Sequence, residues 1–151
     1  MDWLELINAS RLLVSGQPTQ AALRRAVSTA YYAMFHALAA SNADLIVGPR
    51  TPANESRWIA TYRSLRHFRA ENPLHGWAHF FSSPVQNFAY VIGIIKKERE
   101  QADYNPGATV TFAQNQVITW IDAAEQATID FNTASSQERA MVAIATLAGQ
   151  R

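Results

Sequence analysis

The chain has 151 residues, of which 48% are hydrophobic and 17% charged, with a formal net charge of +1. This composition is typical of one globular domain covering residues 1–151 and excludes a disordered chain. The lack of cysteine excludes disulfide bonds, thiolate metal sites and cysteine nucleophiles. No signal-peptide pattern is present, and the longest apolar run, Val91–Ile95, is too short to cross a bilayer. We therefore expect a cytoplasmic protein without membrane contact.

Charge is distributed unevenly along the chain. Seven arginines stand between Arg24 and Arg69 against two acidic residues, whereas six acidic residues and no lysine or arginine lie between Arg99 and Arg139. A basic half beside an acidic half fits a surface that binds a polyanion such as nucleic acid. It fits equally well the pairing of two helices, or of two copies of the chain.

Apolar residues recur at helical spacing, and the alternation expected of strands is absent. A first short helix is predicted over about Asp2–Val14. A second begins near Pro18, a residue suited to a first helical turn, and runs to about Ser41. Its inward stripe is predicted to contain Leu23, Val27, Ala30, Met34 and Leu38, backed by Ala22, Ala26, Ala33 and Ala37.

A loop over Asn42–Pro52 precedes a third predicted helix. Its apolar positions are Trp58, Tyr62, Leu65 and Phe68, and Asn72-Pro73 is expected to stop it because a residue before proline avoids the helical region.

Three further helices follow, each opened by a capping-box pattern. The pattern is Ser83 with Gln86 for the fourth, Thr111 with Gln114 for the fifth, and Ser135 with Glu138 for the sixth. The fourth helix ends at Asn105 and carries an inward stripe of Val85, Phe88, Ile92, Ile95, Arg99 and Ala102. The stripe of the sixth contains Met141, Ile144 and Leu147. The sequence predicts an all-α, up-and-down bundle of four long helices and one or two shorter ones.

Polar and aromatic residues on two of these helices have structural and functional interpretations. Tyr31 and Tyr32 fit core packing with their hydroxyl groups at the edges. His36, one turn later, fits a base, an RNA contact, or a hydrogen-bonded histidine beside the core. Arg24 and Arg25 are expected to face solvent or an acidic helix. Near the end of the fourth helix, Arg99 and Asp103 are spaced for an intrahelical ion pair, with Tyr104 capping the helix end.

Two of these stretches resemble the HEPN-domain family. Ala22–Ala40, reading ALRRAVSTAYYAMFHALAA, resembles its alanine-rich signature helix, and Arg99–Tyr104 resembles an Arg-x-x-Ala-Asp-Tyr motif of related families. The order and length of the second to fifth helices also agree, so the resemblance covers about residues 5–132.

The resemblance implies a compact HEPN-like bundle, often a homodimer. Many family members are metal-independent endoribonucleases of toxin–antitoxin or defence systems, and some toxins have a small nucleotidyltransferase-like antitoxin as partner. Other members bind RNA or nucleotides without cleavage, or serve in protein interaction and dimerisation. No cofactor is implied.

The ribonuclease members carry an arginine followed, after four to six residues, by a histidine. Arg69 and His75 are the pair with this spacing here. Histidine exchanges protons near neutral pH, and arginine binds phosphate oxygens with paired hydrogen bonds. The chain departs from the family in having Ala70 after the arginine and in placing the pair around Pro73, at a helix end and in a loop.

The surrounding residues admit three interpretations. Arg63, Arg66 and His67 form the solvent face of a helix end, or they bind RNA phosphates together with Trp77 and His79 as stacking groups. In the third interpretation His67, His75 and His79 bind a metal, but Glu71 is the one acidic residue nearby, so we predict no metal site.

Overall fold

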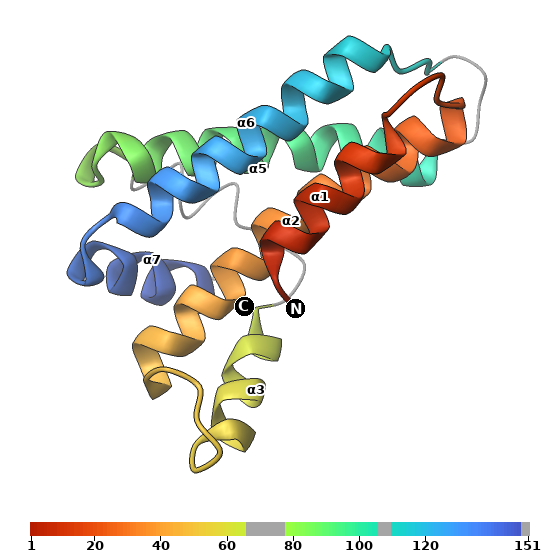
Figure 1. Ribbon diagram of the computed structural model, residues 1–151. Helices are drawn as coiled ribbons and strands as arrows, with labels where there is room; N and C mark the ends of the chain where they lie inside the picture. Colours follow the sequence, from red (N-terminus) through yellow and green to blue (C-terminus); the bar gives the residue numbers. More distant parts are fainter. Residues whose placement is uncertain (66–77, 106–109, 149–151) are drawn as a thin grey trace.

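The computed structural model describes residues 1–65, 78–105 and 110–148. Within these ranges the chain forms α-helices, one short 3-10 turn and no strand (Figure 1). The helices are α1 (Trp3–Leu13), α2 (Gln20–Val47), α3 (Glu55–Ser64), α5 (Ser83–Tyr104), α6 (Gln114–Thr133) and α7 (Ser136–Ala148), and the turn η1 covers Ala78–Phe80. The prediction of an all-α bundle is confirmed. None of the described helices combines the length and apolar character needed to cross a membrane.

Helix α2 is the centre of the fold. It runs through the whole molecule in Figure 1, and α1, α3, α5, α6 and α7 all pack against it. Alanines on several of its faces, including Ala26, Ala30 and Ala33, are fully buried and let neighbouring helices approach closely. Burial on several sides follows from a helix that is apolar or small nearly all round.

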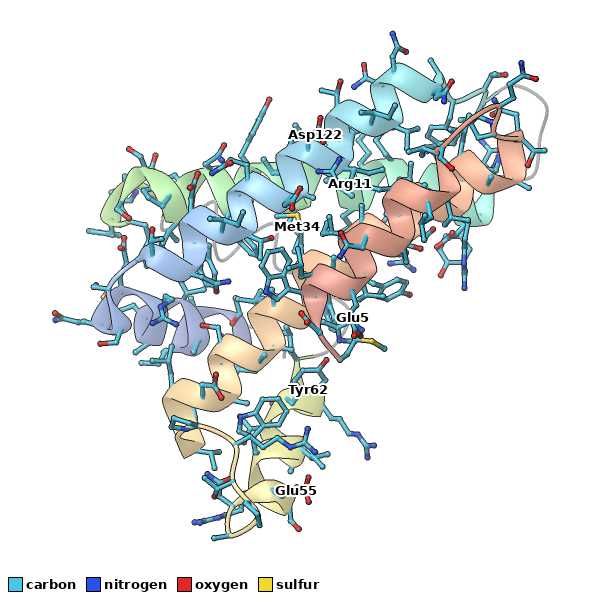
Figure 2. All side chains as sticks on the ribbon, viewed as in Figure 1. Glu5, Arg11, Met34, Glu55, Tyr62 and Asp122 are labelled. Atoms are coloured by element: carbon cyan, nitrogen blue, oxygen red, sulfur yellow. The ribbon has the colours of Figure 1, made fainter. Side chains whose placement is uncertain are left out.

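The predicted inward stripes of α2 and α5 are confirmed. Leu23, Val27, Met34 and Leu38 of α2 are at most 3% exposed, and Met34 lies in the middle of the bundle in Figure 2. The α5 stripe is buried along its full length, from Val85 to Ala102, and includes the charged Arg99. Phe88 of α5 stacks on Phe131 of α6, with ring centroids 4.4 Å apart. Together these residues form one continuous core.

An ion pair joins α1 to α6. Arg11 Nη1 lies 2.6 Å from Asp122 Oδ1, and its Nη2 donates to Glu125 (Figure 2). The hydrogen bond with Glu125, and to a smaller extent that with Asp122, raises the pKa of Arg11. The acidic second half of the chain is thus used, at least here, for pairing two helices within the molecule.

The bounds of two helices differ from the prediction. Helix α2 continues past Ser41 to Val47 and ends at Gly48, whose φ of 94° is a conformation that favours glycine. Helix α3 ends at Ser64, whereas the sequence predicted that it continues to Asn72. The backbone of Leu65 is extended, with φ −67° and ψ 98°, and its side chain is 3% exposed. The chain leaves the helix there while placing Leu65 in the core.

Two predicted capping boxes are also wrong by one or two residues. The N-cap of α5 is Ser82, whose backbone N–H and hydroxyl both donate to Glu138 of α7 instead of closing a local box. The N-cap of α6 is Ala113, and the side chain of Gln114 donates to the carbonyl of Val14 at 2.8 Å. Long-range hydrogen bonds have replaced the local ones that the sequence pattern predicts.

Helix α7 begins as predicted but presents a different face. The Glu138 N–H donates to Ser135 Oγ at 3.1 Å, which confirms this N-cap. Of the three predicted inward residues, Met141 and Ile144 are 40% and 65% exposed and Leu147 is partly buried against the core, whereas Val142 is fully buried. The small residues of α7 allow a closer contact with α2 than the larger ones would, and Asn42 of α2 donates to Thr146 there at 3.0 Å.

The sequence predicted that Arg24 faces solvent or an acidic helix, whereas its guanidinium binds backbone carbonyl groups. From α2 it reaches the C-terminal end of α5, where its guanidinium donates to the carbonyls of Ala102 at 3.0 Å and Asn105 at 2.9 Å. It also donates to the carbonyl of Val110 at 2.9 Å. A cation that satisfies the last carbonyls of a helix also interacts favourably with the helix dipole. Arg24 therefore fastens the start of α2 to the end of α5.

Replacing Arg24 by methionine should lower the free energy of unfolding by about 2 kcal/mol, because several carbonyl groups lose a charged donor. Urea denaturation followed by circular dichroism measures the change. Arg25→Met is the matched control, since Arg25 is exposed on the same helix, and should cost less than about 0.5 kcal/mol. Equal losses in the two variants would contradict the capping role.

Candidate functional site

Several predicted site residues lie outside the described residues. These are Arg66, His67, Arg69, His75 and Trp77. The predicted catalytic pair, Arg69 with His75, therefore stays a prediction. Of the predicted RNA-contacting side chains, Arg63 and His79 are described.

Arg63 and His79 are both exposed but belong to separate parts of the fold. Arg63 lies in the last turn of α3, and His79 lies in η1 directly before α5. Figure 1 shows α3 and the first turn of α5 at different places in the molecule. The ring of His79 is 4.0 Å from that of Phe80, which is 67% exposed, whereas Phe81 is buried. The described part of the chain thus offers cationic and aromatic groups on the surface without gathering Arg63 and His79 into one site.

The two motifs that carry the family resemblance meet in space. Arg99 of α5 is 6% exposed and lies against the tyrosine pair of α2. Its guanidinium carbon is 5.0 Å from the ring centroid of Tyr31 and 5.3 Å from that of Tyr32. The same guanidinium carbon is 5.7 Å from the ring centroid of Tyr104. A cation enclosed by aromatic faces gains electrostatic attraction where solvent is excluded.

Hydrogen bonds fix the same guanidinium in place. Arg99 Nε donates to Asp103 Oδ2 at 3.0 Å, which confirms the predicted i, i+4 ion pair. Arg99 Nη2 donates to the Tyr104 hydroxyl at 3.1 Å, and the hydroxyl of Ser28 on α2 donates to Asp103. Burial works against the charge of Arg99, but the bond with Asp103 and the three tyrosines outweigh it, so the pKa of Arg99 is raised.

Tyr104 does not cap α5 in the predicted way. The side chain is 71% exposed, and its hydroxyl accepts from Arg99. The end of α5 is closed instead by the Asn105 N–H, which donates to the Gln101 carbonyl at 3.3 Å, and by Arg24. Local sequence patterns do not reveal this use of Arg24, because it joins residues about eighty positions apart in the chain.

The hydroxyl group of Tyr31 is buried and has no hydrogen-bond partner among the residues that the structure describes. Burial raises the pKa of Tyr31 to about 12, while the charge of Arg99 opposes part of this rise. The group is therefore neutral at physiological pH and packs as a core aromatic, as the packing interpretation states, but its hydroxyl does not reach the edge of the core that this interpretation expected.

His36 is a hydrogen-bonded histidine beside the core, as one of the predicted alternatives states. Its Nδ1 is bonded to the hydroxyl of Tyr62 on α3, and the two rings are stacked at 5.7 Å with an interplanar angle of 9°. Burial, followed by the charge of the Met1 ammonium, lowers the pKa of His36. At neutral pH the imidazole is uncharged and able to accept the Tyr62 proton in this bond.

Tyr62 and Trp58 were read from the sequence only as apolar positions of α3. Trp58 Nε1 donates to Asp44 of α2 at 2.7 Å, and the Trp58 ring stacks on Tyr62 at 5.1 Å. The helical spacing of Trp58, Tyr62 and Leu65 was the available signal, but spacing alone does not reveal which polar atoms their rings meet. No group of His, Asp or Glu able to hold a metal occurs among the residues of 1–65, 78–105 and 110–148.

No protein-family model, curated protein or solved structure matches this chain significantly. The comparison with HEPN proteins therefore depends on the residues themselves, above all on the tyrosines of α2 and on Arg99, Asp103 and Tyr104 of α5.

Tyr31→Phe should change the free energy of unfolding at neutral pH by less than about 1 kcal/mol, because the hydroxyl makes no described hydrogen bond. At high pH the variant should differ from the wild type. Folded Tyr31 keeps its proton to about 12, whereas the unfolded residue loses it near 10.0, so its contribution to stability falls as the pH rises between these values.

Urea denaturation over this alkaline range measures both effects. Tyr31→Phe should lack the part of the alkaline loss that Tyr31 causes, and the control Tyr32→Phe should retain it. An unchanged alkaline loss in Tyr31→Phe would show that Tyr31 ionises as readily in the folded as in the unfolded chain.

Proposed function

We propose that the chain is a HEPN-like, RNA-directed module of a toxin–antitoxin or defence system, acting as a metal-independent endoribonuclease in the cytoplasm. The observation that carries this proposal is the contact between its two motifs. Tyr31 and Tyr32 of α2 enclose Arg99 of α5, and Asp103 and Tyr104 complete the cluster. Residues 67 or more positions apart in the chain, singled out by the family resemblance, thus form one unit of the fold.

The proposed reaction is cleavage of RNA by its own 2′-hydroxyl group. The 2′-oxygen loses its proton and attacks phosphorus, and the 5′-oxygen takes a proton and leaves, which gives a 2′,3′-cyclic phosphate and a free 5′-hydroxyl. His75 would exchange these protons, and Arg69 would bind the phosphate oxygens as negative charge increases on them. Neither role requires a metal or a cofactor. In a homodimer, two such pairs would meet in one cleft.

Exposed arginines support RNA as the ligand. Arg57 and Arg63 of α3 are exposed and have no acidic partner among the described residues. Arg50, by contrast, is paired with Glu55. Unpaired cations gain more from phosphate contacts than cations that must first leave a carboxylate. Arg66, His67, Trp77 and His79 extend the proposed RNA-contacting set.

The alternative is a non-catalytic domain for nucleotide binding, protein interaction or dimerisation. The exposed apolar side chains favour it, because Phe80, Tyr90 and Ile144 are 67%, 61% and 65% exposed. Large apolar groups on a surface mark contact sites when they gather in a patch. A homodimer partner or a nucleotidyltransferase-like antitoxin would be the protein bound.

The ribonuclease proposal predicts cleavage of a generic single-stranded RNA by the purified protein in the presence of EDTA. Arg69→Ala and His75→Ala should each reduce the cleavage rate by at least about a hundredfold, the usual size of a lost acid–base or phosphate-binding group. Product ends are read by gel electrophoresis with and without removal of cyclic phosphate.

Arg25→Ala provides the control, since it removes one exposed arginine from α2 far along the chain from the proposed pair. This variant should cleave at the wild-type rate. An inactive wild type, or cleavage that survives in both Arg69→Ala and His75→Ala, would refute the proposed catalysis and leave the binding alternative.

RNA binding makes a separate prediction. Affinity for single-stranded RNA should fall with increasing salt, and Arg63→Ala should reduce the slope of log K against log salt by about 0.7, the value for one lost phosphate contact. Fluorescence anisotropy at several salt concentrations measures the slope. Lys97→Ala, which removes one exposed cation from α5, should leave the slope unchanged. The same decrease in both variants would indicate attraction by net charge instead of a contact at Arg63.

A further inference from the structure

Helix α3 is attached to α2 by a row of aromatic rings. Tyr32 and His36 of α2 lie one turn apart, with ring centroids at 6.2 Å. His36 stacks on Tyr62 at 5.7 Å, and Tyr62 stacks on Trp58 at 5.1 Å with an interplanar angle of 21°. In Figure 1, α3 extends away from the rest of the bundle beside the last turns of α2, so this row makes much of its attachment.

Two side-chain hydrogen bonds supplement the stacking. Tyr62 is bonded through its hydroxyl to His36 Nδ1, and Trp58 donates to Asp44 at 2.7 Å. Figure 2 shows Tyr62 at the end of α3 that faces the bundle and Glu55 at the opposite end. Since α3 has ten residues, it is too short to be stable by itself, and its helical state depends on this contact.

His36 is the titratable group at the centre of the contact. From α2 it meets the rings of Tyr32 and Phe35, and from α3 it meets Tyr62, whose pKa is raised by burial. The Met1 ammonium, which precedes α1, acts on it as a like charge. Glu5 in the first turn of α1 is exposed. Among the described residues, the surroundings thus disfavour a second positive charge.

We propose that protonation of His36 releases helix α3 from α2, so that the attachment of α3 is a pH-sensitive contact. The imidazolium would be partly cut off from water and close to the Met1 ammonium, whereas release of α3 exposes it to solvent. In the charged state Nδ1 also carries a proton and no longer accepts from Tyr62. The inference does not depend on RNA or catalysis, although α3 also carries the exposed Arg57 and Arg63.

The direction of the pH dependence follows from proton binding. The pKa of His36 is lowered from 6.5, first by burial and then by the Met1 ammonium, so the attached form binds fewer protons than the released form. Attachment of α3 to α2 is fully favoured above pH 6.5. It weakens as the pH falls below 6.5 toward the lowered pKa of His36. The ordinary pKa of Tyr62 is 10.0 and burial raises it further, so Tyr62 stays neutral throughout this pH window.

Amide hydrogen exchange with mass spectrometry tests the proposal, using the full chain at about pH 7.5 and about pH 5.5 with correction for intrinsic exchange. Amides of α3 should lose protection at the lower pH, while amides of α5 should not. Equal protection of α3 at both pH values would overturn the proposal. Equal loss in α3 and α5 would also overturn it, because it would indicate unfolding of the whole domain.

Two variants separate the titration of His36 from the packing of its ring. His36→Phe keeps an aromatic ring without a proton to bind, and α3 protection should then be the same at both pH values. Tyr62→Phe removes the hydroxyl and leaves His36 titratable, so protection should be weaker but still pH-dependent. A wild-type pH response in His36→Phe would assign the effect to another group.

A direct measurement does not require either variant to fold. The imidazole proton signals of His36 in the wild-type chain, followed by NMR against pH, should give a midpoint below the ordinary value of 6.5. A midpoint at or above this value would show that attachment of α3 does not disfavour the protonated ring, and the proposal would be wrong.

Discussion

The fold depends on the burial of α2 along most of its length and on several of its faces. Every other described α-helix packs against it. This arrangement is possible because small alanine side chains are buried on several faces of α2, where they allow close approach of neighbouring helices, while Leu23, Met34 and Leu38 fill the core. A helix without a free apolar face fixes the positions of its neighbours, since each must cover a different side of it. The places of α1, α5 and α6 around α2 follow from this constraint.

Arginine side chains then connect elements that the apolar core alone would leave free to slide. Arg99 of α5 lies against the tyrosines of α2 and is held by Asp103, and Arg24 of α2 reaches the carbonyls at the end of α5. The two contacts lie at one end of the α2–α5 pair and fix its register. A guanidinium suits both tasks because it stays charged when partly buried and donates in several directions. The contact between the two family-like motifs thus also holds α2 and α5 together.

The sequence predicted the helical class, the inward faces of α2 and α5, the Arg99–Asp103 pair and the N-cap at Ser135, since each follows from spacing within a few residues. It failed at the end of α3, where Leu65 leaves the helix to enter the core, and at the N-caps of α5 and α6. The side chain of Ser82 bonds to Glu138 of α7, and that of Gln114 bonds to the carbonyl of Val14 at the C-cap of α1. Local patterns do not encode such distant partners. Of the predicted site, the described residues include Arg63 and His79 on separate elements, while Arg69 and His75 lie outside them.

The sequence by itself determined that this chain forms helices, which side of α2 and α5 turns inward, and which few residues resemble a known family. These properties depend on residues three or four positions apart, because that is the distance over which one helical turn brings side chains together. Only the tertiary structure decided the partners of the charged and aromatic groups. It placed the guanidinium of Arg24 on the carbonyl groups at the end of α5, the guanidinium of Arg99 against the tyrosine rings of α2, and the ring of His36 against Tyr62. These contacts of Arg24, Arg99 and His36 join residues of different helices that the chain separates by tens of positions, and they form only when the packing of whole helices brings the side chains together.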